Sequence, residues 1–474
     1  MTHFPRLMIS AAHKSSGKTV ISTGLAAAFR DAGHDIGTFK KGPDYIDPMW
    51  LSAASGAPCY NLDFNAMQRG EIKPFFQSRA QSGVGGLSLV EANKGLFDGV
   101  HADGGDSNAA LAKLLCLPVV LVIDTGGVTR GIAPLLLGYC GFDEHVNIAG
   151  VILNKVAGSR HERKLRESVE GYTDLPVLGA VARQPGLEIG ERHLGLTTPD
   201  ECDGQSALIT GFADAVRAGV DLDALIRVAT SAPDMPRATV PPTRGNAGQG
   251  LRIGVARDTA FGFYYPDDLE ALQAQGAELV FIDMIHDSHL PDIDGLFIGG
   301  GFPEMRMQAL SANIPLRAQL KTALDNGLPT YAECGGLMYL CRSLNFNEQT
   351  LPMVGAINGD AVMHTRPQGR GYVAFEDTDS HPWGAAGQRQ TAHEFHYASI
   401  DNLALDTKFA RTMIRGAGIS GQDDAVVIHN IVAGFCHLRN TGPSPWVPRF
   451  LKFVSLASKT KRNPATMGGV SEVP

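Results

Sequence analysis

Short apolar runs and longer amphipathic stretches alternate along the first 200 residues of the chain. Val20–Arg30 has apolar positions at the spacing that is typical of a helix. The apolar runs have the length of buried strands and lie at Arg6–Ala11, Leu87–Glu91, Pro118–Asp124 and Ala149–Asn154. Continuous apolar strands separated by helices predict a mostly parallel sheet, so we expect an α/β domain here.

A second alternating region begins at Leu251 and ends near Val454. Its strands are expected at Arg252–Ala256, Glu278–Ile282, Gly295–Ile298 and Pro329–Ala332. The pattern fades after Asp200, and residues 232–250 are rich in Pro and Gly, as in a linker. The sequence therefore predicts an α/β domain over residues 1–200, a helical segment and linker over 201–250, a second α/β domain over 251–455 and a loose tail over 456–474.

The composition is that of a globular protein, and it narrows the class of partner. The 474 residues are 44% hydrophobic and 19% charged, with a net charge of −8 and no basic run, which argues against a nucleic-acid partner. No apolar segment is long enough to cross a membrane, and the N-terminus has no signal-peptide pattern. Seven scattered cysteines fit a reducing compartment, so we expect a cytoplasmic protein without a membrane partner.

Residues 12–19 read A-H-K-S-S-G-K-T and lie between the first predicted strand and helix. This is the pattern of a phosphate-binding loop, except that Ala12 stands where the first glycine is expected. Because alanine has a Cβ atom, the loop must begin with negative φ or accept a little strain. The alternative is a chance Ser/Gly turn before a helix. The residues expected to bind ATP are Ser15, Ser16, Gly17, Lys18 and Thr19, with the Thr19 hydroxyl as a Mg²⁺ ligand.

Residues 38–48 read T-F-K-K-G-P-D-Y-I-D-P and form the next polar segment. The two prolines restrict the residues that precede them, so this is a fixed loop. Lys40, Asp44 and Asp47 are then placed to hold a metal ion and a carboxylate-bearing substrate together. The alternative is a polar turn after a strand.

Further polar residues end or follow the predicted strands of the first domain. Carboxylates at the carboxyl ends of parallel strands face the crevice where ligands bind, which makes Glu91 a second candidate ligand for Mg²⁺. Asp98 is a weaker candidate for substrate contact, and Asn154 and Lys155 are candidates for contact with the nucleotide base. Taken singly, each of them, and Asp124 as well, is better explained as a polar strand terminus.

A second candidate centre lies in residues 331–337, which read Y-A-E-C-G-G-L. Cys334 stands between an apolar strand and a helical stretch predicted over 337–343, on a turn that Gly335 and Gly336 allow. The helix N-terminus is expected to favour the thiolate. His437 ends a late apolar run and is the expected base. A buried structural thiol is the alternative for Cys334 alone.

Two further features surround this candidate centre. The triplet at 299–301 follows another predicted strand and offers N–H groups, so we expect an oxyanion hole formed by Gly300, Gly301 and Gly335. Arg439 stands where a glutamate two residues after His437 would orient the base, so the pair is a dyad or finds its third member elsewhere. His393 and His396 point to opposite faces of a strand, which favours substrate contact or a structural role over metal binding.

Together these motifs resemble those of the cobyrinate a,c-diamide synthase family over residues 5–455. The matching segments are S-G-K-T, F-K-x-G-P-D-Y-I-D-P, G-L-F-D-G, E-R-H-L-G-L, G-G-G-F-P-E, Y-A-E-C-G-G-L-M-Y-L and H-E-F-H-Y. The resemblance implies two three-layer α/β domains. The first is a P-loop domain like dethiobiotin synthetase, and the second is a class I glutamine amidotransferase domain of flavodoxin-like fold.

The resemblance also implies an ATP-dependent carbon–nitrogen ligase whose partners are a tetrapyrrole carboxylate, glutamine and ATP. Cys334 would attack glutamine and His437 would move the proton, so that a glutamyl thioester releases ammonia. At the other site Mg²⁺–ATP would phosphorylate an a- or c-acetate carboxylate, and ammonia would convert the acyl phosphate into an amide. The sequence does not determine the oligomeric state, and a homodimer is one option. The residues implied at the ATP–substrate site are Asp44, Tyr45, Asp47 and Glu91.

Two departures from the family pattern leave the identity of the substrate ring undecided. Lys94 stands where methionine is common, and residues 437–440 read H-L-R-N instead of beginning H-L-H. Both features are similar to the subgroup that accompanies dissimilatory sulfite reductase and is thought to amidate sirohaem or its metal-free precursor. Cobyric acid synthase is another alternative, which the Asp44–Asp47 loop disfavours. A partitioning-type ATPase switch with an inert amidotransferase-like module would need a lysine where His13 stands.

Overall fold

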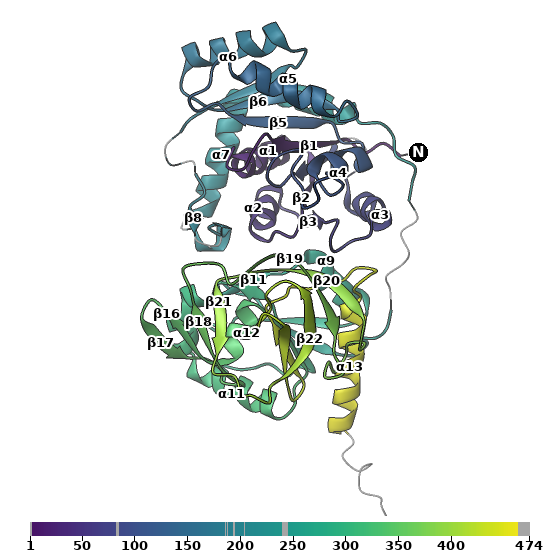
Figure 1. Ribbon diagram of the computed structural model, residues 1–474, viewed down its shortest axis with the longest axis vertical. Coiled ribbons are helices and arrows are strands. Elements are labelled where there is room, and N and C mark those ends of the chain that lie inside the picture. The colour runs from purple at the N-terminus through teal and green to yellow at the C-terminus, as the bar shows by residue number, and fades with distance from the viewer. Residues whose placement is uncertain are drawn as a thin grey trace, which may run out of the picture. The chain divides into compact units, whose positions relative to one another are not determined.

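The computed structural model describes residues 2–81, 85–184, 186, 188–192, 195–202, 204–238 and 245–462. The chain divides into two compact units, residues 1–241 and 242–474 (Figure 1). Each unit has its own sheets and its own hydrophobic clusters.

The first unit is built on a seven-stranded sheet in the order β3-β2-β4-β1-β5-β6-β7. All of its strand pairs are parallel. The four strands predicted from apolar runs are β1, β4, β5 and β6, so the predicted parallel sheet is confirmed. The strands are β1 Arg6–Ala11, β2 Asp35–Lys41, β3 Cys59–Leu62, β4 Gly86–Glu91, β5 Val119–Asp124, β6 Ile148–Val156 and β7 Val177–Ala182.

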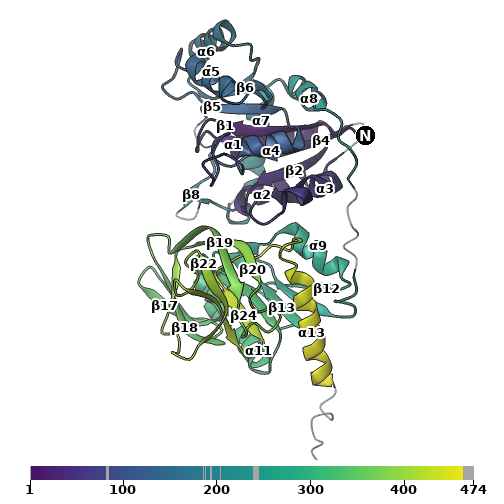
Figure 2. The ribbon, with the colours of Figure 1, turned by 45° about the vertical axis from the view of Figure 1, so that its right-hand side comes forward.

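Helices cover both faces of this sheet, as the continuous apolar strands require (Figures 1 and 2). Along β1, Leu7 and Ile9 pack with α1, α2, α7 and α8, whereas Met8 packs with α3, α4, α5 and α6. The helices are α1 Lys18–Asp31, α2 Ile46–Ser55, α3 Arg69–Arg79, α4 Asn108–Leu115, α5 Ile132–Phe142, α6 Ser159–Tyr172, α7 Gln205–Gly219 and α8 Leu222–Thr230.

The segment predicted as helical beyond residue 200 contributes to the core of the first unit. Phe212 and Val216 of α7 are buried against α1, where a Cβ atom added at Gly24 would lie 2.6 Å from the Phe212 carbonyl oxygen. Two short strands and a short helix precede α7; they are β8 Glu191–Arg192, β9 Gly195–Leu196 and η1 Pro199–Glu201. Within the E-R-H-L-G-L motif, residues 193 and 194 lie outside the described residues.

The second unit contains a nine-stranded mixed sheet in the order β12-β10-β13-β15-β24-β23-β22-β19-β20. The first five strands are parallel, and the remaining pairs are antiparallel. The strands are β10 Arg252–Ala256, β12 Glu278–Ile282, β13 Gly295–Ile298, β15 Thr330–Glu333, β19 Gly369–Asp377, β20 Arg389–His396, β22 Lys408–Arg415, β23 Asp423–Ile428 and β24 Ile431–Gly434.

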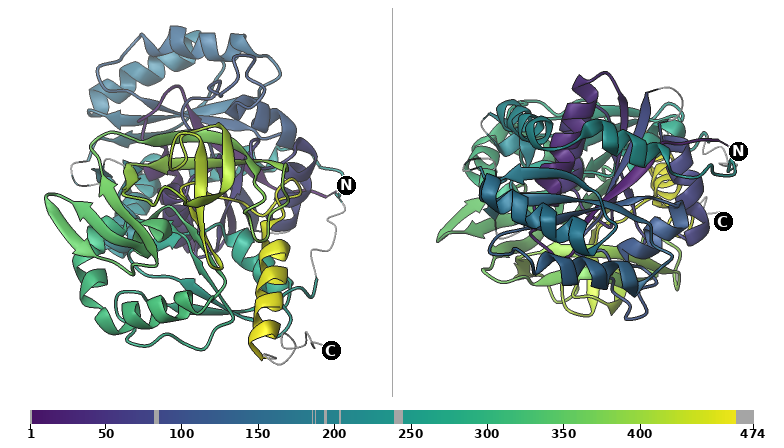
Figure 3. Two further views of the ribbon diagram at one scale, coloured as in Figure 1. Left: turned by 60° about the horizontal axis from the view of Figure 1, so that its bottom comes forward. Right: turned by 90° about the horizontal axis from the view of Figure 1, so that it is seen from above.

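Helices also flank the parallel part of this sheet. Phe297 and Tyr331 pack against α13, whereas Ile298 and Ala332 lie in the cluster that contains α11 and α12. Figure 3 shows α13 as the yellow helix of the second unit. The predicted three-layer α/β class is therefore confirmed for both units. The helices are α9 Pro266–Ala274, η2 Pro303–Arg306, α10 Met307–Ala312, α11 Ile314–Asp325, α12 Gly335–Leu340 and α13 Trp446–Arg462.

Two expectations about helix ends were wrong. Residues 456–462 were assigned to a loose tail, but they continue α13, which packs through Phe450, Leu451 and Val454. The helix predicted over 337–343 is α12, and it stops at Leu340. Cys341 instead begins a strand that pairs on both edges, because its apolar residues are buried in a second sheet.

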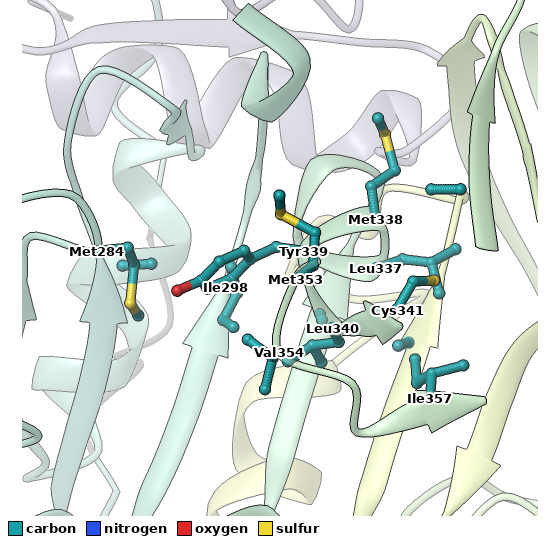
Figure 4. Close-up of a cluster of buried hydrophobic side chains, with 14 of the residues drawn as sticks. Met284, Ile298, Leu337, Met338, Tyr339, Leu340, Cys341, Met353, Val354 and Ile357 are labelled. Atoms are coloured by element: carbon teal, nitrogen blue, oxygen red, sulfur yellow. The ribbon is translucent and has the colours of Figure 1, made fainter. Parts of the chain in front are cut away.

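That second sheet has four strands in the order β17-β16-β18-β21. Figure 4 shows the side chains of α12, from Leu337 to Leu340, together with Met353, Val354 and Ile357, in one buried cluster. These strands are β16 Cys341–Phe346, β17 Gln349–Pro352, β18 Ile357–Met363 and β21 Ala398–Asp401, and a separate two-stranded sheet joins β11 Phe261–Phe263 to β14 Gly300–Gly301.

Candidate functional sites

The phosphate-binding loop joins β1 to α1 in the first unit. Ser15 and Gly17 have positive φ angles of 64° and 84°, which turn the backbone sharply before the helix begins at Lys18. Ala12 is absent from the described non-glycine residues that have positive φ, so the loop begins without the strain considered for it. The missing glycine is therefore accommodated by ordinary backbone geometry.

Asn154 and Lys155 hold this loop from the end of β6. The Asn154 amide donates to the Ser16 carbonyl at 2.9 Å, and the Lys155 ammonium donates to the Ser15 carbonyl at 3.2 Å and to Asp124 at 2.8 Å. A Cβ atom added at Gly17 would lie 2.2 Å from the Asn154 side-chain nitrogen. The two residues thus contact the loop itself, and their expected contact with the base stays a prediction.

Lys18 and Thr19 reach polar groups at the carboxyl end of β4. The Lys18 ammonium donates to the Lys94 carbonyl at 2.7 Å, and the Thr19 hydroxyl donates to the Glu91 carboxylate at 3.0 Å. Burial, with a contribution from the charge of Lys40, lowers the pKa of Lys18 to about 8. The pKa remains above neutral pH, so Lys18 is positively charged there and suited to a phosphate.

Lys40 lies at the centre of a cluster of carboxylates. Its ammonium donates to Glu91 at 2.8 Å and to Asp47, and it lies 4.0 Å from Asp44. Burial alone would lower the pKa of Lys40, but Asp47 and Glu91 raise it above its ordinary value. Burial and the neighbouring charge of Asp47 raise the pKa of Asp44 to about 7. The structure thus brings Glu91, which is 51 residues from Lys40 in the sequence, together with three residues of the 38–48 loop.

The same loop also supports α2. The Asp44 carboxylate accepts from the backbone N–H groups of Ile46 at 3.0 Å and Asp47 at 3.1 Å, and buried Tyr45 lies at the N-terminal boundary of α2. Asp98 accepts from the N–H of Gly95 at 2.9 Å. The roles of Tyr45 and Asp98 in substrate binding stay predictions.

The residues expected to hold Mg²⁺ have the chemistry that this ion requires. Glu91 is fully buried, and its second carboxylate oxygen has no hydrogen-bond partner. The described part of the chain contains no group of three or more His, Cys, Asp or Glu side chains arranged to hold a metal by themselves. Mg²⁺ commonly uses one or two carboxylates and completes its shell with phosphate oxygens and water, so Thr19, Glu91 and Asp44 fit an ion that arrives with ATP.

The candidate nucleophile of the second unit lies between β15 and α12. Cys334 is 8% exposed and has φ 48° and ψ −100°, a strained backbone conformation of the kind that sharp turns at nucleophiles adopt. Burial, with Glu304 nearby, raises the pKa of the Cys334 thiol above its ordinary value, which opposes the expected stabilisation of the thiolate. The thiol therefore needs a base when it reacts.

Glycines pack closely around the nucleophile. A Cβ atom added at Gly335 would lie 3.1 Å from the Gly301 backbone nitrogen, and one added at Gly300 would lie 2.6 Å from Cε1 of His437. The three residues expected to form the oxyanion hole are thus neighbours in space. The Gly299 N–H donates to the Tyr264 hydroxyl at 2.9 Å, so it does not offer the free N–H group expected of the triplet.

His437 is buried and lies between two other side chains. Its ring stacks on the ring of His393, with centroids 4.9 Å apart and planes 15° apart, and the two residues form an antiparallel backbone bridge. Its Nδ1 atom lies 3.4 Å from Oε2 of Glu333. Sequence reasoning missed both neighbours, although Glu333 ends a buried strand as Glu91 does.

Comparison with known proteins agrees with both sites. Residues 7–196 match the family of CobQ/CobB/MinD/ParA nucleotide binding domains, and residues 252–443 match CobB/CobQ-like glutamine amidotransferase domains. The chain is 42% identical to the cobyrinate a,c-diamide synthase of Magnetococcus marinus, over 95% of this chain and 97% of the relative. It is 37% identical to the enzyme of the same name from Methanosarcina acetivorans, over 92% of each chain.

The chain belongs to the cobyrinate a,c-diamide synthase family. The predicted glutamine-dependent, ATP-using ligase class is therefore confirmed. A solved structure of PurLQS from Thermotoga maritima aligns over 45% of this chain and 99% of its own, at 15% identity and a TM-score of 0.33. No helix among the described residues is long and apolar enough to cross a bilayer.

Arg439, which departs from the family pattern, and His396, which belongs to the matching H-E-F-H-Y segment, both have clear partners in the structure. The Arg439 guanidinium donates to Asp267 at 3.0 Å and lies over the ring of Tyr265, so it has a structural role of its own. The His396 ring stacks on Phe435 with centroids 3.7 Å apart. His393 and His396 thus contact different residues, as expected for opposite faces of a strand.

Proposed function

We propose that this enzyme converts the a- and c-acetate carboxylates of cobyrinate into amides. The observation that carries the proposal is that one chain, closely related to enzymes of that name, contains both a loop for ATP phosphates and a buried cysteine that directly follows Glu333, whose carboxylate lies 3.4 Å from His437. The first supports activation of a carboxylate, and the second supports release of ammonia from glutamine. Neither activity alone would require both sites.

The first unit would bind ATP through backbone N–H groups of residues 15–19 and through the Lys18 ammonium. Mg²⁺, when bound to Thr19, Glu91 and Asp44, would neutralise charge on the phosphates. Lys40 holds Asp47 and Glu91 in fixed positions beside the loop, and Tyr45, Asp47 and Asp98 are proposed to orient the ring carboxylate that attacks the γ-phosphate. The acyl phosphate that results has a leaving group that ammonia can displace.

The second unit would generate that ammonia. The Cys334 sulfur adds to the carboxamide carbon of glutamine while His437 takes the thiol proton, and the N–H groups of Gly300, Gly301 and Gly335 stabilise the oxyanion. His437 then gives the proton to the departing ammonia, and water hydrolyses the glutamyl thioester. The close packing of these residues supports the assignment. The seven free cysteines favour a reducing compartment with an ATP supply, and we propose the cytoplasm.

The test is incubation of the protein with ATP, Mg²⁺, glutamine and either cobyrinate or sirohaem, followed by mass spectrometry of the ring. Each amide formed from a carboxylate lowers the mass by about one unit, so the products with one and two amides are resolved. We expect two amides on cobyrinate. Amidation of sirohaem alone, or of more than two side chains of cobyrinate, would overturn the proposed substrate in favour of the sirohaem or cobyric acid alternatives.

A further inference from the structure

Glu333 is a buried carboxylate next to the nucleophile in the chain. It is 2% exposed and ends β15, directly before Cys334. Its Oε1 atom accepts from the Tyr331 hydroxyl at 2.5 Å and from the N–H of Leu438 at 2.8 Å. With Oε1 engaged twice, Oε2 faces Nδ1 of His437 at 3.4 Å.

A second layer fixes this carboxylate in place. The Tyr331 ring stacks on Phe297 with centroids 5.4 Å apart, and its hydroxyl also lies 3.5 Å from the Arg411 guanidinium. Arg411 is fully buried and pairs with Asp424 at 3.3 Å. The Tyr331 hydroxyl therefore has little freedom to release Glu333.

The backbone around His437 is held on both sides by this network. Asp424 accepts from the N–H of Cys436 at 3.2 Å, and Glu333 accepts from the N–H of Leu438. The other face of the His437 ring is covered by His393, whose pKa is held well below its ordinary value by burial and by His437. His393 is therefore neutral and adds no charge that would compete with Glu333.

We propose that Glu333 is the third member of the glutaminase centre, a positioning residue that keeps the proton of neutral His437 on Nδ1 so that Nε2 faces Cys334 as the base. A general base needs the correct tautomer, which is set by the hydrogen bond at its other nitrogen. This inference rests on the proposed release of ammonia from glutamine at Cys334. Arg439, two residues after His437, is bound to Asp267 and cannot serve this role.

The proton balance follows from this arrangement. Nε2 takes the Cys334 proton as the C–S bond forms, giving an imidazolium whose Nδ1–H is stabilised by the Glu333 carboxylate. The Nε2 proton then passes to the nitrogen of glutamine as the C–N bond breaks and ammonia leaves. Glu333 accepts the hydrogen bond from Nδ1–H throughout and never transfers a proton itself.

The decisive variant is Glu333→Gln. Its side-chain oxygen can keep the hydrogen bonds from Tyr331 and Leu438, while its NH₂ group faces Nδ1 and favours the wrong tautomer. We expect kcat for glutamine hydrolysis to fall by about 10²–10⁴-fold, with KM for glutamine within about twofold, because only the base is affected. Amidation driven by ammonium salts should be unchanged, because it bypasses this centre.

Asp377→Asn is the matched control. Asp377 is also a buried carboxylate of the second unit, and its partners include the N–H of Ala385 at 3.1 Å, the side chain of Gln390 at 2.8 Å and His381 at 4.0 Å. We expect this variant to keep glutamine hydrolysis. Tyr331→Phe removes one donor to Glu333 and should lower kcat by about tenfold, which provides a second test if Glu333→Gln does not fold.

Glutamine hydrolysis within threefold of wild type in a folded Glu333→Gln protein would overturn the inference, as would an equal loss of the glutamine- and ammonium-driven activities. A change in KM alone would overturn it too. The wild-type protein separates this inference from the proposed function: no release of glutamate by wild type, with or without ATP and ring, would mean that the second unit is not a glutaminase at all.

Discussion

The two candidate sites differ in the charge of their side chains before a ligand binds. The phosphate-loop site contains several charged side chains: Lys40 forms ion pairs with Asp47 and Glu91, and the Lys18 ammonium donates to a backbone carbonyl. At Cys334 the thiol is buried, and burial together with the charge of Glu304 raises its pKa above the ordinary value, which favours the neutral form. The first site is prepared for a ligand that is already charged. The second develops charge only when glutamine arrives, and this contrast can be tested.

The largest effect is expected for Cys334→Ser. Glutamine-dependent amidation should fall by at least about 10³-fold, because a buried hydroxyl is a much weaker nucleophile than the thiol, while ammonium-dependent amidation persists. The mass of the product formed with glutamine or with ammonium measures the two amidation activities separately. Cys341→Ser is the control, since it places a hydroxyl at another buried cysteine of the same unit. Loss of both activities in the Cys334 variant alone would contradict the separation of the sites.

Asp44→Asn should impair the ATP-dependent reaction and leave the glutaminase reaction active. ATP-dependent amidation should fall by about 10²-fold or more with either nitrogen source, because an amide cannot ionise to bind the metal at the proposed site, whereas glutamine hydrolysis continues at some level. Phosphate release measures the ATP-dependent reaction and glutamate release measures glutamine hydrolysis, and both can be followed in the same samples. Asp143→Asn, at an exposed pair with Lys113, should leave both unchanged. If glutamine hydrolysis fell as far as phosphate release, the two chemistries could not be assigned to separate residues.

The protonated state of Cys334 predicts a pH dependence. Since burial raises the pKa of this thiol, the thiolate fraction grows with pH throughout the neutral range, and alkylation by iodoacetamide should speed up about tenfold per pH unit between pH 7 and 9. Mass spectrometry of the peptide that contains Cys334 follows the reaction, and exposed Cys116 reports on the reagent in the same digest. A fast, pH-independent rate at Cys334 would show that a thiolate is present before glutamine binds.

The smallest effect is expected for Gly17→Ala, paired with Gly33→Ala. Both glycines have similar positive φ, 84° and 87°, so both variants should lose about 1 kcal/mol of stability to backbone strain. Only at Gly17 would the new Cβ atom meet Asn154, whereas it has nothing within 4 Å at Gly33. We therefore expect the KM for ATP to rise, by about fivefold or more, only in the Gly17 variant. Equal KM values would mean that Asn154 gives way without disturbing the loop.

Much of the fold could be predicted because its strands are continuous apolar runs. The strands that carry the phosphate loop and Glu91 were identified in this way, and the loop was identified from Gly17, Lys18 and Thr19. Helix ends were harder to predict from the sequence. Cys341, for example, is apolar and suits a helix or a buried strand equally well. Only the pairing of that residue in a second sheet decides between the two.

The candidate sites were predictable where one short motif contains the chemistry, and not where distant residues meet. Cys334 and His437 were predicted, but Glu333 was not, because the third residue was expected two positions after His437, where Arg439 stands. Glu333 follows the same rule that identified Glu91, a carboxylate at the carboxyl end of a buried parallel strand. The stacking of His393 on His437 depends on a bridge between remote segments, which no local pattern records.

The position of β15 and β24 has a consequence for how the second unit could be controlled. The two strands are neighbours in the middle of the nine-stranded sheet, and the Cys334 N–H donates to the Gly434 carbonyl at 2.7 Å. Amide protons there should be among the slowest in the unit to exchange with deuterium, because exposing them requires the sheet to open. A switch for ammonia release would therefore have to operate through substrate access, and not by loosening the scaffold that carries the thiol and its base.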